Sequence, residues 1–116
     1  MLLTQVKMGQ SLLVDEFVQW DDNSSQFVRC TDQNLMVGVV DQPPELIGSD
    51  YVGVIRQAGV ATAIAGEDIP AQGGALGIDA NGRAIISTGH SCGIIQAQPY
   101  GQPARVAGDR VVIWLR

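Results

Sequence analysis

Turn-forming residues recur so regularly along this chain that they limit it to short segments of regular structure. Glycine, proline, asparagine and aspartate separate apolar runs that are rich in valine and isoleucine, a composition typical of strands. Helical periodicity is poor, because Gly9 interrupts the loose apolar stripe over Met1–Val18. The predicted strands are Ser11–Trp20, Gln26–Cys30, Met36–Asp41, Tyr51–Gln57, Gly59–Ile64, Ala75–Ile78, Ala84–Ser87, Gly93–Gln96 and Arg110–Leu115.

These short strands predict an all-β fold, a small barrel or sandwich with at most one short helix, for which Asp50–Gln57 is the candidate. The connectors carry the turn chemistry that hairpins need. Asp21–Ser25 and Asp79–Gly82 each join two strand candidates, and Asn81-Gly82 supplies the positive φ values of a tight turn. We therefore expect two hairpins at these positions.

One arrangement of strand and turn residues occurs twice. Gln26–Cys30 followed by Val37–Pro44 resembles Arg83–Ser87 followed by Cys92–Pro99, with an Asp/Asn turn before each copy. The pattern favours a repeated unit of a hairpin plus a strand, related by pseudo-symmetry inside one barrel. Chance recurrence of similar short segments in an all-β chain is the alternative.

Length and composition indicate one globular domain over residues 1–116, because single cores commonly form at roughly 100–150 residues. Charged residues make up 16% of the chain, below the usual quarter. The weakly polar surface that results suits a subunit that is partly covered by neighbours.

The charge pattern and the short apolar runs exclude two classes of partner. Net charge is −5 and the seven basic residues are scattered, whereas nucleic-acid binding needs a concentrated positive surface. No apolar run approaches the ~20 residues of a membrane span, and the N-terminus lacks the features of a signal peptide. We expect no nucleic-acid or membrane partner, a cytosolic site of synthesis, and reduced core thiols at Cys30 and Cys92.

Residues for catalysis or metal binding are sparse. His90 lies two residues before Cys92, but no helix N-terminus is evident there to lower the thiol pKa, so we interpret them as a loop histidine beside a buried cysteine. One histidine and two distant cysteines do not provide a zinc site. Asp79–Gly82 lacks the later acidic ligands of a calcium loop, and no glycine motif continues as a phosphate-binding loop. We predict no catalytic residue, no cofactor and no metal.

One segment is similar to an enzyme motif. Leu46–Ile55 resembles the Gly-x-Ile-Asp-x-x-Tyr-x-Gly motif of dUTPases, but Gly48 stands where the catalytic Asp is needed. Hydrolysis without that general base is not expected, and Tyr51 is interpreted as a packed aromatic residue. A nucleotide hydrolase related to dUTPase is therefore kept as an alternative function.

The C-terminal half resembles a family of phage proteins. Gly59–Ala71, Leu76–Ala84, Cys92–Ile95 and Ala107–Leu115 follow one another in an order similar to that of the capsid decoration (cement) proteins of tailed phages. The resemblance covers about Val54–Arg116, and it departs from the family at Gln72 and over Gln96–Tyr100.

This resemblance implies a small β-barrel or β-clip of about eight or nine strands without an active site. It further implies a virion structural protein, made in the bacterial host cytoplasm, that binds the exterior of the head as homotrimers at three-fold positions and stabilises it. The partners would be the major capsid protein and other copies of the chain. A β interaction module of a phage tail or baseplate is a further alternative.

Two sets of residues are candidates for contacts. Residues 1–10 are either a free N-terminal capsid-binding arm or a first barrel strand. In the first case Met1, Leu2, Leu3, Val6 and Met8 would contact the capsid. The second set, Trp20, Trp114 and Tyr51, are expected to be anchors of the core or of the trimer interface.

Overall fold

The computed structural model describes residues 2–89 and 91–115 of the protein. In this part of the chain we find nine strands and one short 3-10 turn, Gln33–Leu35, so the prediction of an all-β fold is confirmed. No helix in these residues is long and apolar enough to cross a membrane. The strands are β1 Leu2–Lys7, β2 Phe17–Asp21, β3 Gln26–Arg29, β4 Met36–Ile47, β5 Asp50–Ile64, β6 Gly74–Ile78, β7 Ala84–Ile86, β8 Gly93–Ile95 and β9 Arg110–Leu115.

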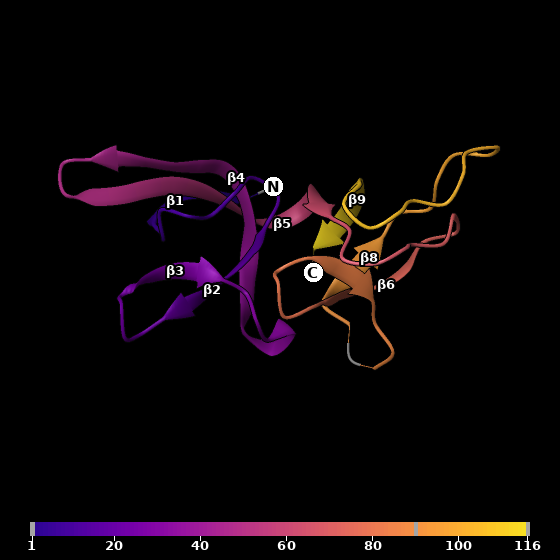
Figure 1. Ribbon diagram of the computed structural model, residues 1–116, viewed down its shortest axis with the longest axis horizontal. Helices are drawn as coiled ribbons and strands as arrows, with labels where there is room; N and C mark the ends of the chain where they lie inside the picture. The colour runs from indigo at the N-terminus through magenta and orange to yellow at the C-terminus, as the bar shows by residue number, and fades with distance from the viewer. Residues whose placement is uncertain (1, 90, 116) are drawn as a thin grey trace.

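The strands form two small barrels that share β5 (Figure 1). Residues 50–58 of β5 pair with β4 on one side and with β1 on the other, and residues 59–64 pair with β9. We call β1–β4 with residues 50–58 barrel 1, and residues 59–64 with β6–β9 barrel 2. A parallel bridge between Met8 and Phe27 brings the two edges of barrel 1 together, and one between Ala65 and Ala84 does the same in barrel 2.

The two barrels are copies of one unit. In barrel 1 the order β3-β2-β4-β5-β1 contains the β2–β3 hairpin, and in barrel 2 the order β7-β6-β8-β9-β5 contains the β6–β7 hairpin. Local hydrogen bonds also correspond, since Cys30 N donates to Phe17 O at 2.8 Å and Ser87 N donates to Ala75 O at 2.9 Å. The predicted repeat is present, but its two copies form two barrels that share β5 and do not lie inside one barrel as predicted.

Buried residues occupy equivalent positions in the two barrels. The buried core of barrel 1 contains Met8, Leu12, Val18, Val40 and Ile55, and the equivalent positions of barrel 2 hold Ala65, Ile69, Leu76, Ile95 and Ile113, all of which are buried. Each half of the chain therefore builds its own apolar interior from the same strand positions.

Equivalent glycines allow strands to approach closely in both barrels. A Cβ atom on Gly38 of β4 would lie 2.6 Å from the carbonyl oxygen of Arg56 in β5. A Cβ atom on Gly93 of β8 would meet the carbonyl oxygen of Trp114 in β9. Only glycine leaves room for the backbone of the neighbouring strand at these two positions.

Two strand predictions were too short and one helix prediction was wrong. β4 continues through Pro43 and Pro44, where irregular pairing between Gln42 and Glu45 accommodates residues that lack an N–H donor. Tyr51–Gln57 and Gly59–Ile64, predicted as separate strands, form the continuous β5, which contains Gly59 at a φ of 83°. Ladders on both sides of residues 52–56 hold the Asp50–Gln57 segment extended, so it is not a helix.

The predicted strand Ser11–Trp20 was too long at its start. Residues 9–16 turn instead, with Leu12 N donating to Gly9 O at 3.3 Å and Asp15 adopting a φ of 71°. Regular pairing begins at Phe17. These turns carry the chain from the end of β1 back to the start of β2.

The barrels are packed against each other. Phe17, Cys30 and Val39 point out of barrel 1 and join the apolar cluster of barrel 2. Phe17 N donates to Gly82 O at 3.1 Å, and Ile78 N donates to the side-chain oxygen of Gln33 at 3.2 Å. Both apolar packing and hydrogen bonds therefore fix the relative orientation of the barrels.

The thiol predictions are confirmed for Cys30, and for Cys92 in part. Neither cysteine forms a disulfide; Cys30 is buried and its Sγ donates to Asp32 O at 3.2 Å, whereas Cys92 is half-buried. Burial raises the pKa of the Cys30 thiol from 9.0 to about 11. The folded protein therefore holds this proton more tightly than the unfolded chain does.

A pH-dependent loss of stability follows from the Cys30 pKa. The thiol leaves the free energy of unfolding unchanged below pH 9.0 and lowers it as the pH rises from 9.0 to about 11. Urea unfolding across this range should show a decline in the wild type that is smaller in Cys30→Ala. Equal slopes in the two proteins would contradict the assignment, and lysine and tyrosine titrations cancel in the comparison.

Candidate interaction surfaces

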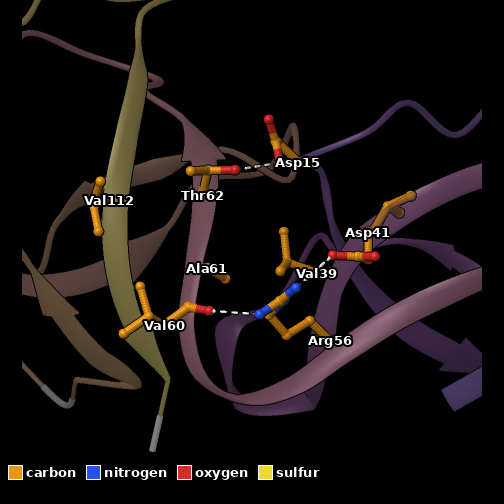
Figure 2. A pocket seen from close by; sticks show the side chains of 9 residues that line it. Asp15, Val39, Asp41, Arg56, Val60, Ala61, Thr62 and Val112 are labelled. Carbon is orange, nitrogen blue, oxygen red and sulfur yellow. Dashed lines mark hydrogen bonds and ion pairs between the residues drawn. The ribbon is translucent and has the colours of Figure 1, made fainter. Parts of the chain in front are cut away.

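A cleft of about 250 Å³ lies where the two barrels meet (Figure 2). Asp15 comes from the turn before β2, and Asp41 and Arg56 come from β4 and β5. The complete lining is Asp15, Val39, Val40, Asp41, Arg56, Val60, Ala61, Thr62 and Val112. Both halves of the chain contribute to this lining.

The charged side chains of the cleft form ion pairs and hydrogen bonds with neighbouring residues. Arg56 Nη2 lies 2.9 Å from Asp41 Oδ1, and Arg56 Nη1 donates to Val60 O at 3.1 Å. Asp15 accepts from Thr62 Oγ1 at 2.6 Å and forms an ion pair with Arg110 Nε at 2.7 Å. Because Asp15 belongs to barrel 1 and Thr62 and Arg110 to barrel 2, these contacts strengthen the joint between the barrels.

A long hairpin formed by β4 and β5 projects beyond barrel 1 (Figure 1). Gly48 turns the chain at its tip with a φ of 65°, and Leu46 and Ile47 beside it are 60% and 53% exposed. The dUTPase-like segment lies here, with Tyr51 half-buried opposite Leu46 and Asp50 paired to Lys7 Nζ at 3.3 Å. Gly48, which stands where dUTPases have their catalytic Asp, therefore lies in an exposed turn.

Three of the N-terminal candidates, Leu2, Leu3 and Val6, lie in a strand, and Met8 follows it. Leu2–Lys7 form β1 along β5, which is the barrel-strand alternative of the two that the sequence left open. Leu3 is 48% exposed, Val6 is half-buried, and Met8 is fully buried in the core of barrel 1. Met1 lies outside the described residues, and a capsid contact by this set stays a prediction.

Of the two roles that the sequence left open for Trp20 and Trp114, an anchor of the core is excluded, and an anchor of the trimer interface stays a prediction. Trp20 is 45% and Trp114 is 49% exposed. Trp114 lies between the buried Ile113 and Leu115, so strand alternation turns it outward. Trp20 packs edge-on against Phe27 at 5.2 Å between ring centroids, and its Nε1 donates to Asp22 Oδ1 at 2.6 Å.

Trp114 is part of an exposed apolar row on the outer face of barrel 2. Strand register places Val60 opposite Trp114, Trp114 opposite Ile94, and Ile94 opposite Ala75. Val60, Trp114 and Ile94 are 37%, 49% and 52% exposed, and Ala75 is also exposed. We call these four residues the apolar row; sequence reasoning found only Trp114 among them.

A basic pocket of about 280 Å³ lies next to the apolar row. It is lined by Gln96, Ala97, Gln98, Pro99, Arg105, Arg110 and Val112. Gln96 links the pocket to the row, because its Oε1 accepts from Trp114 Nε1 at 3.2 Å.

Arg105 is buried, with 6% of its surface exposed, and donates to Gln96 O at 2.7 Å and Pro70 O at 3.1 Å. Within the described chain its Nε has no hydrogen-bond partner and its guanidinium forms no ion pair.

His90 lies outside the described residues, so the sequence-based interpretation of His90 beside Cys92 is not tested by geometry. Cys92 Sγ lies 3.4 Å from the carbonyl oxygen of Leu76, to which it donates. Over residues 2–89 and 91–115, no group of three or more histidine, cysteine, aspartate or glutamate side chains is placed to hold a metal ion.

Comparison with known proteins shows a similarity of fold. No protein-family model and no curated protein matches this sequence. Among solved structures, the fold is similar to that of the head fiber gp8.5 N base in bacteriophage phi29, with a TM-score of 0.62 and 10% sequence identity. The match covers 99% of this chain and 93% of that chain. The shared fold therefore includes the N-terminal half, for which the sequence suggested no relative.

Proposed function

We propose that this chain is a structural protein of a tailed-phage virion, a capsid decoration protein that binds the outer surface of the head and stabilises it. The observation that carries the proposal is the shared fold, over nearly the whole chain, with a protein described as part of a phage head fiber base. The resemblance of residues 54–116 to phage cement proteins is an independent reason for the same conclusion.

The surface of the molecule fits this role. Large apolar side chains are exposed on the long hairpin, on β1 and on the apolar row, and they are available for contact with a larger assembly. The proposed partners are the major capsid protein and further copies of this chain, arranged as trimers at three-fold positions. Contacts that are modest individually become strong when one trimer engages several capsid sites.

Binding to phage heads tests the proposal. Purified protein is mixed with expanded, undecorated heads, and co-sedimentation and the thermal stability of the heads are measured. The protein should sediment with the heads and raise the temperature at which they break. Absence of binding, or binding to isolated tails instead, would count against a decoration role.

The N-terminal strand supplies a matched pair of variants for this assay. Leu3 is 48% exposed on β1, and residues 2–7 of this strand pair with β5 along one edge. Their other edge, before the Met8–Phe27 bridge that closes barrel 1, is suited to strand addition by a partner. Leu3→Glu should weaken head binding at least about tenfold. Leu13→Glu is the control, because Leu13 is 60% exposed in the turn that precedes β2; equal effects would exclude β1 as the contact.

A further inference from the structure

Barrel 2 covers the outer face of barrel 1, but the equivalent outer face of barrel 2 is exposed. Phe17 and Val39 are paired on the outer face of barrel 1, and barrel 2 buries them to 0% and 2% exposure. The equivalent pair on barrel 2 is Ala75 and Ile94, which are exposed in the apolar row.

The covering element on barrel 1 is the end of the β6–β7 hairpin. Gly82, in the turn of that hairpin, accepts from Phe17 N at 3.1 Å and packs so closely that a Cβ atom would lie 2.8 Å from Arg29 Cγ. Ile78, at the end of β6, is 7% exposed. A hairpin of one unit therefore docks on the outer face of the unit before it.

Barrel 1 carries an equivalent hairpin, which covers no other part of the chain within residues 2–89 and 91–115. This is the β2–β3 hairpin, in which Trp20 pairs with Phe27 as Ile78 pairs with Ala84. Trp20 is 45% exposed, whereas its counterpart Ile78 is buried. One chain therefore has a free hairpin at one end and a free receiving face at the other.

The two free surfaces carry opposite charges. Residues 20–27, which contain the turn of the β2–β3 hairpin, include Asp21 and Asp22 and no basic residue. The pocket beside the apolar row contains Arg105 and Arg110 and no carboxylate in its lining. Arg110 is already paired with Asp15 at 2.7 Å, so Arg105 supplies the positive charge that has no ion-pair partner within the described chain. The unpaired guanidinium of Arg105 favours an acidic neighbour there, because opposite charges guide association and fix its register.

We propose that the β2–β3 hairpin of a second copy docks on the apolar row of barrel 2, so that copies associate head to tail. Trp20 of the incoming hairpin packs on Ile94 and Trp114, and the two aspartates lie toward the basic pocket. Such a contact joins two different surfaces, and it closes into a ring where the rotation between copies permits. The inference deepens the trimer part of the proposed function by naming the surfaces that meet.

Two variants remove the two surfaces separately. Trp20→Glu alters the hairpin and Ile94→Glu alters the receiving face; both side chains are about half-exposed, so circular dichroism should show a folded protein. In sedimentation velocity the wild type should form oligomers, and each variant alone should be monomeric, with a dissociation constant raised at least about 30-fold. Leu46→Glu, on the long hairpin, should assemble as the wild type does.

A mixture of the two variants identifies the kind of contact. Trp20→Glu keeps an intact receiving face and Ile94→Glu keeps an intact hairpin, so an equimolar mixture should form a 1:1 dimer and nothing larger. A monomeric wild type, a variant that still assembles, loss of assembly in Leu46→Glu, or a mixture that stays monomeric would each overturn the proposal. Head binding is read separately, so either proposal can fail without the other.

Discussion

Replacing Gly93 with alanine will lower the free energy of unfolding by about 3 kcal/mol. The new methyl group would collide with the carbonyl oxygen of Trp114, and it would also lie 3.3 Å from Leu76 Cδ2. Backbone cannot move aside as a flexible side chain does, so β8 and β9 must separate and their ladder must weaken. Urea unfolding should show a lower midpoint with an unchanged slope.

The equivalent glycine of barrel 1 allows the same test to be repeated, and a glycine in a loop serves as the control. Gly38→Ala should destabilise in the same direction, because its Cβ would lie 2.6 Å from the carbonyl oxygen of Arg56. Gly89→Ala should leave the midpoint nearly unchanged, since nothing lies within 4 Å of its Cβ position. If all three variants behaved alike, close approach of the strands would not be the cause.

Phe17→Ala is expected to cost about 3–5 kcal/mol, the range for a fully buried phenylalanine. Phe17 is 0% exposed and lies in the apolar cluster that spans both barrels, so its removal opens a cavity at the joint between them. Trp20→Ala on the same strand is the control and should cost about 1 kcal/mol or less, because the indole is 45% exposed. A small effect of Phe17→Ala would mean that the barrels are held together elsewhere.

Local patterns in the sequence predicted much of barrel 2. Arg110–Leu115 forms a strand with the predicted bounds, and the hairpin turn at Asp79–Gly82 is where Asn-Gly placed it, with Gly82 at a φ of 71°. Turn chemistry acts over a few residues, so it can be read from a sequence. The errors arose where long-range pairing overrides a local signal: Pro43 and Pro44 lie within β4, and Gly59 lies within β5.

The extent of the repeat could not be read from residue identities. Met8 and Ala65 occupy equivalent positions, and they share burial but neither size nor shape. Two barrels of similar topology can fill their interiors with different combinations of apolar side chains, as long as volume and pattern are kept. The recognisable copies were the segments in which glycine or turn chemistry restricts the choice, such as Gly38 and Gly93.

The candidate surface was predicted only in part, for a similar reason. Val111, Ile113 and Leu115 are buried and Trp114 faces outward, but residues 111–115 are all apolar, so the sequence does not show which of them face the core. Val60 and Ile94, which neighbour Trp114, come from distant segments. They meet it only through strand register, which no local pattern specifies.

A strand that belongs to both barrels also determines how the molecule carries mechanical load. The 15 residues of β5 run from the tip of the long hairpin through barrel 1 into barrel 2. Tension between the tip of the long hairpin and barrel 2 acts along this backbone. Its antiparallel ladders to β1, β4 and β9 run perpendicular to the pull, so their hydrogen bonds are sheared together instead of opening one by one.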